Sequence, residues 1–269
     1  MGGHDTAMAV IQTPLGPVGY EEQGGGSAIP ILFLHGVGSD KSVWQPQLDQ
    51  FGASRRAIAM DYPGYGESAF REDATRDDYA RAALALLDAL GVHRAHICGL
   101  SLGGVVAIAM CTMDPSRCAS LIIADSFAVH PDGQAIYDRS VAASRTMDMA
   151  ELAAARAPLL LGTIAATDEA MKDEVIATMG RIDPEAYRLG AAAVWLADQR
   201  DRVERITAAT LVICGDEDQI TPPSLSAELA NAIPGAELVM VNGAGHLANI
   251  EQAKLFNDAV ERFVRGAES

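Results

Sequence analysis

The sequence predicts an α/β fold, with a mostly parallel eight-stranded sheet, helices on both faces and an inserted helical lid. Short apolar runs alternate with amphipathic helical segments along most of the chain, which is typical of parallel crossovers. Hydrophobic residues make up 49% of the chain but aromatics only 5%, which suits strands buried between helices. The alternation stops between about 126 and 205. We therefore expect a core domain from 1–125 and 206–269 and a lid from 126–205.

The individual strands follow from short apolar runs bounded by turn residues. They are expected at 8–12, 18–23, 29–34, 56–60, 95–98, 121–124, 211–214 and 237–241. The first two are separated only by a Pro- and Gly-containing turn at 14–17, which favours antiparallel pairing. Helices are expected at 43–51, 77–90, 102–113, 224–231 and 252–264. Crossovers from strand to helix to strand indicate that the later strands pair in parallel.

The charge and the apolar pattern exclude several classes of partner. A formal net charge of −16 argues against nucleic acid, since phosphate binding needs a basic surface. No segment contains 18 uninterrupted apolar residues, so no transmembrane helix is expected. Residues 1–6 lack the features of a signal peptide, and we interpret their fit to the N-myristoylation pattern as chance. The expected location is the cytoplasm, without a membrane partner.

Cysteine usage points the same way. The four cysteines, Cys98, Cys111, Cys118 and Cys214, show no metal-ligand spacing, and the chain is far larger than a disulfide scaffold. We expect buried free thiols in a reducing compartment. The sequence also lacks a metal-binding cluster and a G-x-G-x-x-G run after a strand, so no metal and no cofactor are expected.

The motif G-x-S-x-G carries the chemistry. It spans Gly99 to Gly103, follows the strand predicted at 95–98 and precedes the helix predicted at 102–113. A serine on a tight strand-to-helix turn needs glycine two residues before and after it, because larger side chains would collide with neighbouring backbone. The helix N-terminus then directs N–H groups towards the site. This context predicts Ser101 as a nucleophile rather than a surface serine in a glycine-rich turn.

Four further segments occur in the order expected for one family. They are FLHGVG at 33–38, DYPGYGES at 61–68, GDED at 215–218 with Pro222 after it, and GH at 245–246 with Glu251 after it. Together with the serine motif, they make the chain resemble the α/β-hydrolase family over nearly its full length. The resemblance implies the chain order of nucleophile, acid and histidine that is found in this fold.

Ester cleavage needs a base and an orienting acid beside the nucleophile. The resemblance assigns His246 as the base, and a neutral imidazole suits that work at physiological pH. It assigns Asp218 as the acid, three residues after Gly215. Asp125 stays open as an alternative acid, because it ends an earlier predicted strand. Backbone N–H groups of Val37 and Leu102 are expected to form the oxyanion hole.

The substrate is less well specified, because it depends on the lid. Apolar lid residues, among them Trp195 and Met147, are candidates for substrate binding, although such residues more often form a lid's own core. Five lid arginines are candidates for meeting a substrate carboxylate, namely Arg145, Arg156, Arg181, Arg188 and Arg200. The loop at 39–44 and the compact lid are similar to 3-oxoadipate enol-lactonases and small carboxylesterases. This resemblance implies a small ester or lactone as substrate.

Other chemistries share the same residues. Carbon–carbon bond hydrolases of ring-cleavage pathways and cofactor-free perhydrolases use the same triad, and some proteins of this fold act as small-molecule receptors. Haloalkane and epoxide chemistry is disfavoured, because those enzymes have an aspartate where this chain has Ser101. Turnover of model esters at about 1–10³ per second would argue against a receptor. The sequence does not specify an oligomeric state.

Overall fold

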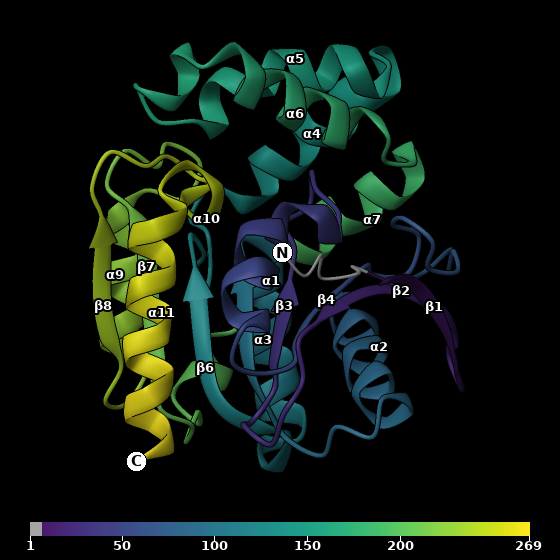
Figure 1. Ribbon diagram of the computed structural model, residues 1–269. Helices are drawn as coiled ribbons and strands as arrows, with labels where there is room; N and C mark the ends of the chain where they lie inside the picture. Colours follow the sequence, from purple (N-terminus) through teal and green to yellow (C-terminus); the bar gives the residue numbers. More distant parts are fainter. Residues whose placement is uncertain (1–6) are drawn as a thin grey trace.

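The computed structural model describes residues 7–269, so the expectations about a signal peptide and N-myristoylation at residues 1–6 lie outside the described part. Eight strands form one sheet in the order β1-β2-β4-β3-β5-β6-β7-β8 (Figure 1). The strands are β1 (Ala7–Thr13), β2 (Gly16–Gln23), β3 (Ile31–Leu34), β4 (Ala57–Met60), β5 (Ala95–Leu100), β6 (Cys118–Ala124), β7 (Thr210–Gly215) and β8 (Glu237–Val241).

The pairing explains the mixed character of the sheet. Strand β2 pairs antiparallel with both β1 and β4, whereas β4, β3, β5, β6, β7 and β8 pair in parallel. Each parallel pair needs a crossover, and the helices between the strands provide these connections. The predicted mostly parallel sheet of eight strands is therefore confirmed.

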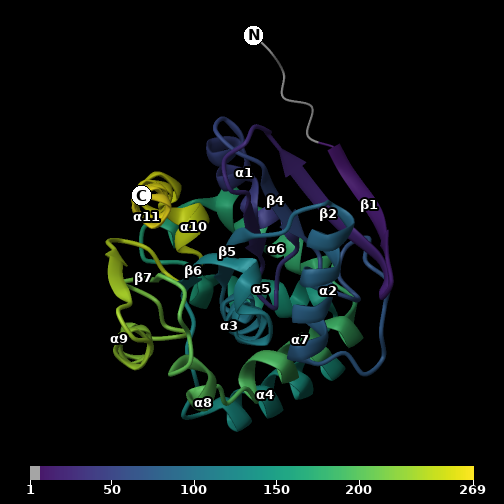
Figure 2. The same cartoon turned by 90° about the horizontal axis from the view of Figure 1, so that it is seen from below.

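Helices cover both faces of the sheet, as predicted (Figure 2). One face carries α1 (Gln45–Gly52), which follows the short helix η1 (Lys41–Trp44), and α11 (Ala253–Glu268), which follows α10 (Ala248–Glu251). The other carries α2 (Arg76–Ala89), α3 (Leu102–Met113) and α9 (Pro223–Ala232). Successive residues of β3 alternate between the two cores, with Ile31 and Phe33 in one and Leu32 and Leu34 in the other. No helix within 7–269 is both long and apolar enough to cross a membrane.

Between β6 and β7 lies a layer of four helices, which we call the helical insert: α4 (Gly133–Thr146), α5 (Met149–Leu160), α6 (Glu169–Gly180) and α7 (Pro184–Trp195). The short helices η3 (Ala165–Thr167) and α8 (Arg200–Val203) complete this part of the chain. Helix α4 packs against α7, and α5 against α6. Figure 1 shows the insert above the edge at which the parallel strands end.

The cysteines depart from expectation. Cys98 and Cys214 are buried and free, but Cys111 and Cys118 form a disulfide. The short helix η2 (Pro115–Arg117) reverses the chain between the end of α3 and the start of β6. This reversal brings the two Cα atoms to 5.6 Å, within the range that a disulfide spans. The expectation of four free thiols is wrong for this pair. Because disulfides are rare in reducing compartments, the cysteines no longer support a cytoplasmic location.

Candidate active site

Ser101 occupies the turn between β5 and α3 in a conformation that non-glycine residues rarely adopt, with φ 55° and ψ −115°. The space around this turn explains its glycines. A Cβ atom on Gly99 would lie 2.1 Å from the carbonyl oxygen of Gly103, and one on Gly103 would lie 1.9 Å from that of Leu34. Only glycine fits these two positions, as the G-x-S-x-G motif predicted.

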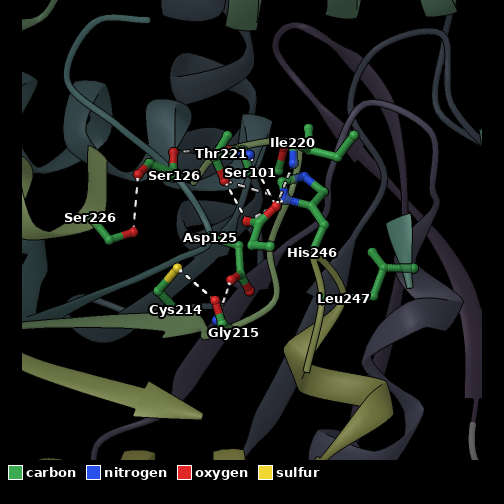
Figure 3. A network of polar contacts seen from close by, with 12 residues as sticks. Ser101, Asp125, Ser126, Cys214, Gly215, Ile220, Thr221, Ser226, His246 and Leu247 are labelled. Atoms are coloured by element: carbon green, nitrogen blue, oxygen red, sulfur yellow. Dashed lines mark hydrogen bonds and ion pairs between the residues drawn. The ribbon is translucent and has the colours of Figure 1, made fainter. Parts of the chain in front are cut away.

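His246 and Asp218 lie in the loops that follow β8 and β7, and both are buried. Nδ1 of His246 is 2.9 Å from Oδ2 of Asp218. The hydroxyl of Thr221 donates to the same carboxylate oxygen at 2.7 Å and lies 3.3 Å from Nδ1 of His246. Figure 3 shows Thr221 and His246 close together near Ser101. Thr221 received no role from the sequence, although an aspartate in a loop often accepts hydrogen bonds from the backbone just after it, which would place the following residues beside its carboxylate.

Backbone amides hold the other oxygen of Asp218. Oδ1 accepts hydrogen bonds from the N–H groups of Ile220 at 2.8 Å and Thr221 at 3.0 Å. Burial acts to raise the pKa of this carboxyl, but the nearby His246 and the hydrogen bonds outweigh it, so the pKa falls below its usual value. Asp218 is therefore an ionised carboxylate at neutral pH and can orient an imidazole through Nδ1.

Asp125, the alternative acid, has a different environment. It directly follows β6, with φ 47°, and its Oδ1 accepts a hydrogen bond from the N–H of Gly215 at 2.8 Å (Figure 3). Burial, together with the charge of Asp218, raises the pKa of the Asp125 carboxyl far above its usual value. Its other oxygen has no hydrogen-bond partner among the described residues. A carboxyl whose pKa is raised and that bonds to the N–H of Gly215 rather than to His246 is a poor orienting acid.

Asp125, Cys214 and Asp218 also form the one group within 7–269 whose ligand atoms lie close enough together for a metal ion, within 4.8 Å of one another. Their chemistry fits a cation poorly. Burial raises the pKa of the Cys214 thiol, as it does that of the Asp125 carboxyl, and metals bind the deprotonated forms. Both oxygens of Asp218 already accept hydrogen bonds. The group is better described as part of the hydrogen-bond network beneath His246.

The loop after β3 lies beside the serine. An ideal Cβ on Gly36 would lie 3.5 Å from the Cβ of Ser101, and the next residue, Val37, lines the same cavity as Ser101. Among the described residues we find no hydrogen bond from the backbone N–H of Val37 or of Leu102. Both donors are thus available to a ligand. His35, just before this loop, is fully buried, and burial lowers the pKa of its imidazole, so it is neutral.

The histidine loop is held by a second carboxylate. Glu251 accepts hydrogen bonds from the N–H groups of Gly245 at 3.0 Å and Leu247 at 3.1 Å, on either side of His246. It also accepts one at 2.7 Å from the N–H of Gly162, which follows α5 of the helical insert. Glu251 therefore joins the histidine loop to the insert, a link that the sequence did not reveal.

Ser101 and His246 line one cavity between the sheet edge and the insert. Its wall from the insert comprises Arg156, Leu160, Glu174, Val175, Thr178, Met179 and Trp195. Trp195, a predicted candidate, therefore lies at the cavity. Met147, the other, does not, because it caps the C-terminus of α4 and lies half-exposed in a neighbouring groove.

Comparison with known proteins agrees with this geometry. The sequence profile described as the alpha/beta hydrolase family matches residues 31–259. The chain belongs to this family. It is 27% identical over 241 residues to 3-oxoadipate enol-lactonase 1 of Acinetobacter baylyi, covering 89% of this chain and 90% of that protein. It is 29% identical over 267 residues to 2-hydroxymuconate semialdehyde hydrolase of Pseudomonas sp., covering 91% and 89%.

A solved structure is similar over the same extent. The crystal structure of an enol-lactonase from Burkholderia xenovorans superposes with a TM-score of 0.90 at 27% identity, covering 96% of this chain and 100% of that one. The predicted relation to enol-lactonases within the α/β-hydrolase family is thereby confirmed. Family membership supports hydrolase activity, while the relatives' names describe more than one kind of bond.

Proposed function

We propose that the protein is a serine hydrolase that cleaves a small carboxylic ester or lactone through an acyl-enzyme intermediate. The observation that carries the proposal is the hydrogen bond of 2.9 Å between Nδ1 of His246 and Oδ2 of Asp218, with His246 and Ser101 on the wall of one cavity. Ser101 is the nucleophile, His246 the general base and Asp218 the orienting acid. A cavity of this kind, with few polar groups, suits a small organic substrate.

The reaction follows from these positions. The carboxylate of Asp218 accepts a hydrogen bond from Nδ1 of His246, so Nδ1 carries the proton of the neutral imidazole. Nε2 of His246 is therefore free to act as a base. Nε2 takes the proton of Ser101 as Oγ attacks the carbonyl carbon, and returns it to the leaving oxygen. Water then attacks the acyl-enzyme with the same assistance, which releases the acid and restores the serine.

The negative charge that develops on the carbonyl oxygen needs donors. The backbone N–H groups of Val37 and Leu102 are proposed to form the oxyanion hole, because neither donates a hydrogen bond within the described residues. Leu102 is also the first residue of α3, so the helix N-terminus adds a favourable dipole.

We further propose that residues 126–205 act as a lid over a core made of 1–125 and 206–269. The helical insert supplies much of the cavity wall, including the apolar side chains of Leu160, Val175, Met179 and Trp195. Closure by such a layer excludes water from the acyl-enzyme until the leaving group has departed. The similarity to a 3-oxoadipate enol-lactonase favours a lactone or a short ester over a long lipid.

The test is turnover of p-nitrophenyl esters of different chain length, simple lactones and an enol-lactone by wild type and Ser101→Ala. We expect burst release of nitrophenol from wild type and a loss of about 10⁴-fold or more in kcat for Ser101→Ala. Asp201→Asn, an exposed substitution, serves as the control. Equal rates for wild type and Ser101→Ala would refute the proposal.

Hydrolysis of a carbon–carbon bond is a second candidate, favoured by the similarity to 2-hydroxymuconate semialdehyde hydrolase. The two functions differ in their substrates, not in the residues at Ser101 and His246. A ring-cleavage diketone belongs in the same panel. Turnover of the diketone that exceeds that of every ester and lactone would move the assignment to this second function.

A further inference from the structure

Two charged side chains lie on the wall of the cavity, Arg156 on α5 and Glu174 on α6. Arg156 is half-buried, and Glu174 is exposed. Arg156 and Leu160 are four residues apart and so share one face of α5. Leu160 also lines the cavity, and its carbonyl accepts a hydrogen bond of 2.8 Å from the N–H of His246. The backbone of Arg156 is therefore about 6 Å along the helix axis from Leu160, the residue that contacts the histidine loop.

Arg156 has no partner within the described residues, as is also true of Arg139 and Arg145, but those two are exposed whereas Arg156 is half-buried at the cavity. Arg181 pairs with Asp40, and Arg188 pairs with Glu185. Within residues 7–269, Arg156 makes no ion pair and no hydrogen bond. This is notable in a chain with a net charge of −16, where carboxylates are abundant. A half-buried guanidinium loses part of its hydration, and an anion in the cavity would compensate for that loss.

We propose that Arg156 determines substrate specificity by binding a carboxylate at the end of the substrate remote from the bond that is cleaved. The inference rests on the proposed hydrolase function and adds the charge of the substrate to it. A guanidinium can grip a carboxylate through two parallel hydrogen bonds. The apolar wall formed by Leu160, Val175 and Met179 would enclose the carbon chain between the two ends.

The chain provides a matched control. Arg139, on α4, is exposed and makes no ion pair within the described residues. It lines a neighbouring groove that Arg156 also borders, but it does not line the cavity of Ser101. Arg139→Gln removes the same charge as Arg156→Gln from nearly the same region. A general effect of net charge would therefore appear in both variants, whereas a direct contact would appear only in Arg156→Gln.

The experiment measures kcat and KM for p-nitrophenyl monoesters of succinate, glutarate and adipate, each paired with its uncharged monoamide. We expect wild type to prefer the charged member of at least one pair. Arg156→Gln should reduce kcat/KM for that ester by about ten- to a hundred-fold, chiefly through KM, as for the loss of a charge-assisted hydrogen bond. For the uncharged monoamide esters, kcat/KM should change by less than about two-fold in Arg156→Gln. Arg139→Gln should have the same kcat/KM as wild type for both kinds of ester.

Two results would overturn the role of Arg156. One is an unchanged preference for the charged esters in Arg156→Gln. The other is an equal loss for charged and neutral esters, which would indicate a structural effect.

Calorimetric titration with glutarate and its monoamide separates this inference from the hydrolase proposal. Glutarate binding that depends on Arg156, without turnover of any ester, would refute the hydrolase and keep the anion site. Ester turnover without glutarate binding that depends on Arg156 would keep the hydrolase proposal and refute the anion site.

Discussion

The two walls of the cavity are built by different interactions. On the core side, carboxylates fix the loops after β7 and β8, since Asp218 and Glu251 each accept several hydrogen bonds. On the insert side, apolar side chains such as Leu160 and Met179 lie beside the charged Arg156 and Glu174, and Arg156 is unpaired within the described residues. Hydrogen bonds define atomic positions, whereas apolar packing tolerates exchange of similar volumes. The core side is therefore suited to chemistry and the insert side to substrate choice.

The sharpest way to test this contrast is to change Asp218 and Asp125, the two aspartates proposed as the orienting acid. Asp218→Asn should keep the amide hydrogen bonds at Oδ1 but place a donor opposite Nδ1 of His246. The imidazole would then adopt the wrong tautomer, and kcat should fall by about 10⁴-fold. Asp125→Asn should stay within about five-fold of wild type, because Asp125 does not bond to His246. Ester turnover provides the measurement, with circular dichroism to verify folding.

The reverse pattern would assign the acid to Asp125. Loss of activity in both variants with intact folding would instead show that the two carboxyls act as one unit.

Thr221 gives a smaller effect on the same side. Its hydroxyl donates to Oδ2 of Asp218 at 2.7 Å and lies near Nδ1 of His246. Thr221→Val keeps the volume but removes the hydroxyl, so we expect a loss of about ten-fold in kcat, in line with one hydrogen bond to a charged group. Thr221→Ser keeps the hydroxyl and should recover most of the activity. If both variants equal wild type, the hydroxyl does not contribute to orienting the histidine.

The same contrast explains what the sequence could reveal. The core side was predictable because its chemistry requires particular residues at particular spacings. Gly99 and Gly103 flank Ser101 because a Cβ at either position would overlap backbone oxygen. The eight strands were predictable because buried parallel strands are short apolar runs between turns. Asp218 and His246 were assigned through resemblance, and the structure places them in hydrogen-bond contact.

The insert side was less predictable because apolar residues on a helix can face a cavity, a core or solvent with the same periodicity. Met179 and Met147 have the same side chain, yet Met179 is fully buried at the cavity and Met147 is 43% exposed in another groove. Arg156 was one of several candidate arginines, and its partial burial at the cavity distinguishes it from Arg145, which also lacks a partner within the described residues. Tertiary contacts of this kind leave no local signal in a single sequence.

These two methionines allow the insert side to be tested. Met179→Ala enlarges the cavity, so the preferred acyl chain in a p-nitrophenyl ester series should lengthen by roughly one to three carbons, with kcat/KM for the best ester within about ten-fold of wild type. Met147→Ala removes the same side chain outside the cavity and should leave the preference unchanged. An unchanged profile in Met179→Ala, with folding verified, would mean that this part of the insert does not contact the substrate.

The smallest effect concerns Asp125 and the dependence of stability on pH. Burial raises the pKa of this carboxyl in the folded protein far above the value of about 3.9 expected in the unfolded chain. Between these two values the folded state holds a proton that the unfolded state has released. The stabilisation is fully present below the unfolded pKa and is lost as pH rises towards the folded pKa.

The asparagine side chain in Asp125→Asn does not titrate, so the loss of stability with rising pH should be absent from this variant. We expect the free energy of unfolding of wild type to decline relative to Asp125→Asn between pH 5 and pH 8, by up to about 1.4 kcal/mol per pH unit if no other group responds. Urea unfolding of both proteins at each pH provides the measurement, and Asp201→Asn controls for the loss of an exposed carboxylate. Parallel curves would mean that Asp125 is already ionised in the folded protein. Two adjacent charges would then lie beneath His246, and the reasoning that leaves Asp218 alone as the orienting acid would fail.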